Sequence, residues 1–215
     1  MSKEVFPRMC RGVRRGERLT SRFPDSCGRR YNAFTLIELI VVVGIIAILS
    51  ALVLSTAGYA RKKSARVRAD TEIAAMSAAL ESYKADNAVY PNNSGTGGTD
   101  GLDPSTIDLA NYQMPCRYMY GEISGDRDFD GTPDTGVRSY MTFKPTSLLR
   151  NNMSDPPSLT NPVFAIRDPF GNSYGYSTAK AAFPNGSAGY NPTFDLWTVA
   201  DGAAGTDQTK WIKNW

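Results

Sequence analysis

The chain has 215 residues, 41% of them hydrophobic, and a formal net charge of +3. It contains no histidine, which excludes a Ser-His-Asp triad and an HExxH zinc site. No Gly-rich phosphate-binding loop occurs either, so we expect a protein that is not an enzyme.

Residues 1–33 form a basic leader with nine Lys or Arg residues and three acids. Because the rest of the chain is slightly acidic, the net positive charge is no sign of nucleic-acid binding. Cys10 and Cys27 lie in this leader, which leaves Cys116 without a disulfide partner in the remainder. We therefore expect a domain that is stabilised by packing or by bound metal.

Residues 34–60 form an apolar segment whose only charged side chain at neutral pH is Glu38. As a helix rising about 1.5 Å per residue, the segment would reach roughly 40 Å, enough to cross a hydrocarbon core of ~30 Å. A carboxylate held in lipid costs about 2.5–3.5 kcal/mol, so Glu38 needs a compensating partner. Lys and Arg flank both ends of the segment, so their distribution does not settle its orientation in a membrane.

Residues 61–91 are predicted to continue this helix as an amphipathic segment that ends near Tyr90-Pro91. Apolar residues recur there at spacings of three and four, which indicates a helix with one face packed on a domain. These residues are Ala69, Ile73, Met76, Leu80 and Tyr83. A basic cluster opens the segment, and we expect it to be solvated or to contact acidic lipid rather than DNA. The cluster consists of Arg61, Lys62, Lys63, Arg66 and Arg68.

Residues 92–215 are predicted to form a small globular domain. The stretch 103–160 is rich in Pro and Asn, and we expect a loop-rich insertion with short strands such as 140–143. Residues 168–176 predict a turn that leads into a strand, and residues 194–199 alternate as a strand does. The expected fold class is α+β, with the long N-terminal helix packed on a small antiparallel sheet.

Residues 126–134 match the first part of a calcium-binding loop, with oxygen-bearing side chains at alternating positions and Gly131 at the sixth. The candidate ligands are Asp126, Asp128, Asp130, Thr132 and Asp134. The twelfth position holds Val137 instead of the bidentate Glu of a complete EF-hand. A solvated Asp/Gly turn therefore stays open as the alternative interpretation.

Ala33, followed by Phe-Thr-Leu-Ile-Glu-Leu at residues 34–39 and a long Val/Ile/Leu run, resembles the class III signal of type IV pilins and type II secretion pseudopilins. The family usually has Gly where this chain has Ala33. Residues 168–176 and 200–202, and the closing Asn214-Trp215, resemble pseudopilin segments in the same order. Most fimbrial pilins close a C-terminal loop with a disulfide. Because Cys116 is the one cysteine beyond the leader, this chain cannot form that disulfide, and the resemblance favours a pseudopilin.

The resemblance implies that a prepilin peptidase cuts between Ala33 and Phe34 and methylates the new amine. It also implies that Glu38 pairs with the Phe34 amine of a neighbouring subunit in a helical fibre. The alternative is that Glu38 only caps its own helix. A second calcium site, at Asp201 and Asp207, is implied by the resemblance as well.

The function that the resemblance implies is that of a structural subunit of a type II secretion pseudopilus in the bacterial inner membrane. Its N-terminus would be cytoplasmic before processing, and its domain periplasmic. The implied partners are further copies of the chain, minor pseudopilins, the prepilin peptidase, and an inner-membrane assembly platform with its ATPase. Two alternatives stay open. One is a type IV pilin or minor pilin for adhesion, motility or DNA uptake, and the other is a monomeric membrane-anchored calcium-binding module or enzyme.

Overall fold

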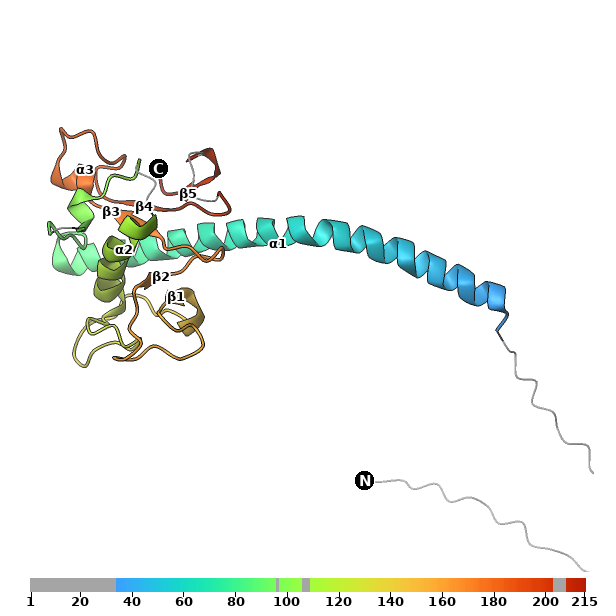
Figure 1. The fold of residues 1–215 in the computed structure, drawn as a ribbon. Helices are drawn as coiled ribbons and strands as arrows, with labels where there is room; N and C mark the ends of the chain where they lie inside the picture. The colour runs from blue at the N-terminus through green and yellow to red at the C-terminus, as the bar shows by residue number, and fades with distance from the viewer. Residues whose placement is uncertain (1–33, 96, 106–108, 203–207) are drawn as a thin grey trace, which may run out of the picture. The chain divides into compact units, whose positions relative to one another are not determined.

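The computed structural model describes residues 34–95, 97–105, 109–202 and 208–215 (Figure 1). In chain order the elements are α1 (Leu36–Asn87), η1 (Thr99–Gly101), α2 (Leu109–Ser124), η2 (Pro145–Ser147), β1 (Leu148–Leu149), β2 (Ala165–Ile166), β3 (Gly175–Ser177), α3 (Ala179–Ala182), β4 (Asp195–Thr198), η3 (Gln208–Lys210) and β5 (Ile212–Lys213). The α+β class and the long N-terminal helix are thereby confirmed. The chain divides into two compact units, residues 1–48 and 49–215.

The described part of the first unit is residues 34–48, the opening of α1, where every side chain is exposed. Among the described residues, α1 is the one helix that is long and apolar enough to cross a membrane. None of its most apolar stretch is buried in the structure.

In the second unit, the last turns of α1 bury one face against the rest of the domain. Figure 1 shows α2 and the strands gathered around this end of the helix. Of the expected stripe, Ala69, Ile73, Met76 and Leu80 are buried, and Tyr83 is half-buried. The helix ends at Asn87 because Ala88 adopts a φ of 65°, and the Ala88 amide donates to the Lys84 carbonyl at 2.7 Å. The amphipathic helix was thus predicted correctly.

Two small antiparallel sheets complete the domain. Strands β1 and β2 pair with Leu148 opposite Ile166, and the second sheet has the order β3-β4-β5. Gly175 of β3 lies opposite Trp197 of β4, and a Cβ atom at Gly175 would come within 2.2 Å of the indole ring. Only glycine lets the tryptophan lie across this strand.

Strand β4 lies between two apolar clusters. Leu196 belongs to the larger core, together with the stripe of α1 and residues of α2. Trp197 belongs to a second cluster, which is made by Leu102, Tyr112, Trp197, Val199 and Trp211. All four residues of β4 are therefore buried, and the sequence alternation at 194–199 does not separate a buried face from a solvent face.

The stretch 103–160 departs from the expected loop-rich insertion because it contains α2. This helix buries Tyr112, Cys116, Met119 and Ile123 on one face, although Pro115 lies inside it. Residues 140–143 do not form a strand, and the described part of this stretch contains β1 as its strand. Proline removes one helical hydrogen bond but did not end α2, because the buried face compensates for that loss.

Candidate assembly and metal-binding sites

The start of α1 is capped by reciprocal hydrogen bonds between Thr35 and Glu38. The Thr35 hydroxyl accepts the Glu38 amide at 3.3 Å, and Glu38 Oε2 accepts the Thr35 amide at 2.9 Å. The same hydroxyl donates to Oε2 at 2.7 Å. This is a capping box, which satisfies amides that a helix start leaves free. In the single chain, Glu38 therefore caps its own helix.

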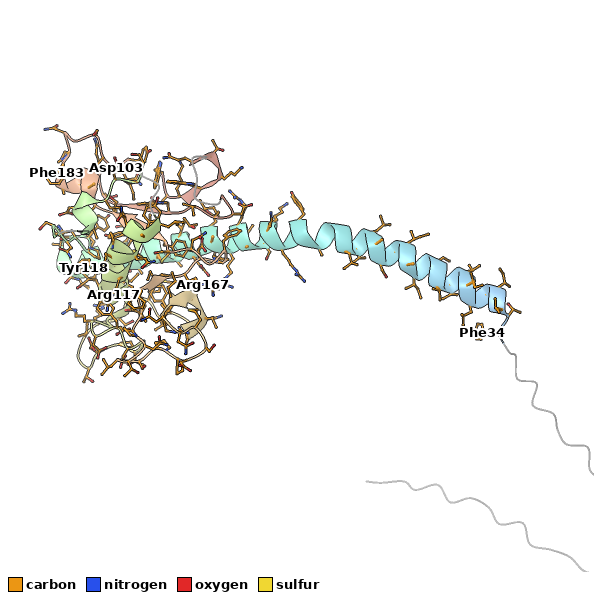
Figure 2. The ribbon with its side chains drawn as sticks, viewed as in Figure 1. Phe34, Asp103, Arg117, Tyr118, Arg167 and Phe183 are labelled. Carbon is orange, nitrogen blue, oxygen red and sulfur yellow. The ribbon has the colours of Figure 1, made fainter. Side chains whose placement is uncertain are left out.

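Capping does not use the whole Glu38 carboxylate. Both Thr35 contacts fall on Oε2, and within the described residues Oε1 accepts no hydrogen bond. The neighbouring Phe34 is 82% exposed, and Figure 2 shows it at the opening of α1. Ala33 lies outside the described residues. The pairing of Glu38 with an amine of another subunit stays a prediction, for which Oε1 accepts no hydrogen bond from the described residues.

The loop after α2 brings together three of the five candidate calcium ligands. Ligand atoms of Asp126, Asp128 and Asp130 all lie within 4.8 Å of one another. Asp126 is fully buried; its carboxylate accepts the amides of Asp130 at 3.0 Å and Gly131 at 2.8 Å. The Tyr120 hydroxyl also donates to it at 2.5 Å. Burial raises the pKa of Asp126, although the hydrogen bonds from Tyr120 and Gly131 oppose the shift.

The other two candidates are engaged at the margin of this cluster. The Thr132 hydroxyl donates to Asp130 at 2.7 Å, and the Asp134 carboxylate accepts the Arg127 amide at 3.0 Å. Phe129, inside the loop, adopts a φ of 65° and packs its ring 3.9 Å from the Arg117 guanidinium. The three-aspartate cluster thus fits a hard cation that prefers oxygen ligands, while Asp134 supports the loop.

The second candidate calcium loop is organised differently. The Asp201 carboxylate forms an ion pair of 2.7 Å with Arg66 of α1, and Arg66 also donates to the Lys210 carbonyl at 2.7 Å. Asp207 lies outside the described residues. Because Arg66 pairs with Oδ1 of Asp201, a calcium ion at this carboxylate would have to compete with Arg66 for its negative charge.

A further buried carboxylate, Asp168, was not singled out as a functional residue by its sequence. It accepts the amides of Phe170 at 2.9 Å and Asn172 at 2.7 Å, and it accepts the Thr198 hydroxyl of β4. Burial raises the pKa of the Asp168 carboxyl, and the hydrogen bonds that it accepts offset only part of this rise. The carboxylate ties the 168–172 turn to the sheet, which confirms that this turn leads into β3 and gives Asp168 a structural role.

Comparison with known proteins adds to this geometry. Residues 28–54 match the family described as the prokaryotic N-terminal methylation motif. The type II secretion system core protein G of Vibrio cholerae is 28% identical over 189 residues, which cover 87% of this chain and 93% of that protein. The chain is therefore similar to a type II secretion system core protein G over most of its length, and it matches the N-terminal methylation motif.

Other relatives have a higher identity but match over a shorter stretch. The core protein G of Pseudomonas aeruginosa is 46% identical over 65 residues, which cover 30% of this chain and 45% of that protein. That of Aeromonas hydrophila is 40% identical over 63 residues, which cover 29% of this chain and 44% of that protein. No solved structure gives a significant match.

Proposed function

We propose that this pilin-like chain is a structural subunit of a type II secretion pseudopilus and acts by polymerising through α1. The observation that carries the proposal is the exposed apolar half of that helix, with Glu38 as its one charged side chain. The similarity to core protein G of Vibrio cholerae supports it, because it spans nearly the whole of both chains. A subunit of this kind needs no catalytic residues.

The proposed assembly starts from a membrane-anchored form. The leader lies on the cytoplasmic side of the inner membrane, residues 34–60 span it, and the domain lies in the periplasm. The prepilin peptidase cuts after Ala33 and methylates Phe34. An inner-membrane platform with its ATPase then adds the subunit to a fibre that also contains minor pseudopilins, and Glu38 pairs with the Phe34 amine of a neighbour.

The test separates this pairing from simple helix capping by means of two variants. Glu38→Ala removes the carboxylate, whereas Thr35→Val removes the hydroxyl partner and keeps the carboxylate. We expect both variants to be cleaved, Thr35→Val to form fibres, and Glu38→Ala to form none. Cleavage is measured by immunoblot, and assembly by electron microscopy and by cysteine crosslinking between helices of adjacent subunits.

Fibres from a cleaved Glu38→Ala variant would contradict the pairing. Equal loss of fibres in both variants would assign Glu38 to capping alone. A cleaved wild-type chain that stays monomeric, without crosslinks, would contradict the proposed function and favour an anchored binding module. Long surface fibres at native expression would favour a type IV pilin.

We further propose that Asp126, Asp128 and Asp130 bind calcium. The proposal is supported by the positions of their carboxylate oxygens, which lie within 4.8 Å of one another. Asp126 is fully buried and holds the loop in place. A bound divalent cation would offset two of the three negative charges of these adjacent carboxylates, in a domain that has no disulfide among its described residues. A second calcium site at Asp201 and Asp207 stays a separate prediction, which the Arg66–Asp201 ion pair disfavours.

The calcium proposal is tested by thermal unfolding of the chain in detergent with calcium or with a chelator. Saturating calcium at about 100 times its dissociation constant stabilises a one-site protein by about 2.7 kcal/mol. We expect the combined variant Asp128→Asn/Asp130→Asn to lose this stabilisation. The control Asp70→Asn/Asp155→Asn removes the same charge from exposed positions outside the loop and should keep it. A calcium response that survives in the loop variant would contradict the site.

A further inference from the structure

The basic cluster of α1 divides into two groups in the structure. Arg66 pairs with Asp201 at 2.7 Å, and Arg68 pairs with Glu72 at 2.8 Å, so these two cations are neutralised by the chain itself. Arg61, Lys62 and Lys63 are exposed and form no ion pair within the described part of the chain. We call these three residues the basic collar.

The sequence around the collar places it at the end of the apolar segment. Residues 57–60 contain no charge, Tyr59 is 73% exposed, and no acid occurs between Glu38 and Asp70. An exposed tyrosine followed by Lys and Arg is the usual composition of a helix where it leaves the hydrocarbon region, because the ring and the long basic chains reach the headgroups. The collar therefore lies at the level of the phosphates when α1 spans a bilayer.

The angular distribution of the collar indicates the kind of partner. Three consecutive residues of an α-helix are 100° apart, so the collar covers about 200° of the circumference. A protein partner on one face would be contacted at spacings of three and four, as the domain contacts Ala69, Ile73 and Met76. A partner that surrounds the helix, such as a lipid leaflet, accommodates all three cations together.

From these observations we propose that Arg61, Lys62 and Lys63 form a binding site for the phosphate headgroups of anionic phospholipids. The site fixes the depth of α1 in the bilayer. It does not require polymerisation, so it can be tested on isolated chains whether or not the pseudopilus assignment holds. Each basic residue at a membrane surface contributes about fivefold in affinity for anionic lipid.

The experiment titrates the full chain in dodecyl maltoside micelles with phosphatidylglycerol and, separately, with zwitterionic phosphatidylcholine. Amide chemical shifts of residues 59–64 report binding at the collar and distinguish it from binding at the leader. We expect these shifts to saturate with phosphatidylglycerol and to change little with phosphatidylcholine. Because three such residues are removed, the variant Arg61→Gln/Lys62→Gln/Lys63→Gln should weaken the apparent affinity at these amides by about a hundredfold.

The matched control is Arg138→Gln/Lys144→Gln/Lys210→Gln, which removes the same charge from exposed positions of the domain outside the calcium loop. It should leave the affinity at residues 59–64 unchanged. An equal loss in both variants would overturn the proposal, because net charge alone would then explain the binding. Amide chemical shifts at the collar that change with protein concentration and not with added lipid would also overturn the proposal. They would indicate that the collar binds an acidic face of a second copy of the chain.

Discussion

The two halves of α1 bury their apolar side chains by different means. Between Leu36 and Leu54 the large apolar side chains are 51–76% exposed, whereas Ala69, Ile73, Met76 and Leu80 are 0–3% exposed. The first half is apolar all round, and the second is apolar on one face only. The apolar face of the second half is therefore buried by the chain's own domain. The apolar side chains of the first half need lipid or other subunits to bury them.

The largest expected effect comes from making the same substitution in each half. Leu80→Ala removes a fully buried side chain and should lower the free energy of unfolding of the domain by about 2–5 kcal/mol. Leu49→Ala removes a side chain that is 56% exposed, and it should change that free energy by less than about 0.5 kcal/mol. Denaturant unfolding in detergent, followed by tryptophan fluorescence, measures both. Similar losses at the two positions would contradict the comparison.

The sequence predicted both halves of the helix because their patterns are local. A charge-poor run and a three-four spacing each indicate a structure without knowledge of distant residues. Helix α2 has a similar spacing at Tyr112, Cys116, Met119 and Ile123, but it was missed. Pro115 and the Pro- and Asn-rich sequence around it are typical of a loop. The helix is stabilised by contacts of its buried face with β2 and β3, which the local sequence does not reveal.

The candidate sites show the same division between local and distant information. The three-aspartate cluster follows from spacing within one loop, and the structure brings Asp126, Asp128 and Asp130 together. The Thr198 contact of Asp168 and the Arg66 contact of Asp201 join residues that are 30 and 135 positions apart. No local pattern predicts such pairs, so the structural role of Asp168 and the pairing of Asp201 emerged only from the fold.

The two regions also differ in the burial of a carboxylate, and a buried carboxylate makes the free energy of unfolding depend on pH. Glu38 is exposed, whereas burial raises the pKa of Asp168 above that of the unfolded chain. The folded state then binds the proton more tightly, so the contribution of Asp168 to stability falls as pH rises from the unfolded pKa to the folded pKa, and is constant above it. The slope is at most about 1.4 kcal/mol per pH unit for one proton.

This dependence is measured by unfolding the chain at pH values from about 4 upward. We expect Asp168→Asn to reduce the slope, because the side chain no longer titrates. The exposed Asp70→Asn serves as the control and should retain the wild-type slope. An unchanged slope in Asp168→Asn would mean that other acids carry the dependence.

The smallest expected effect lies where the exposed half of α1 gives way to the packed half. The Arg66–Asp201 ion pair joins the basic cluster to the C-terminal part of the domain, and both side chains are about one-third exposed, at 35% and 30%. Exposed pairs contribute about 0.2–1 kcal/mol, so Arg66→Gln, Asp201→Asn and the double variant should give a coupling free energy in that range. We expect the same coupling with calcium and with a chelator, because Arg66 already neutralises the carboxylate. A coupling that weakens in calcium would mean that the ion displaces Arg66, and would place Asp201 among the calcium ligands after all.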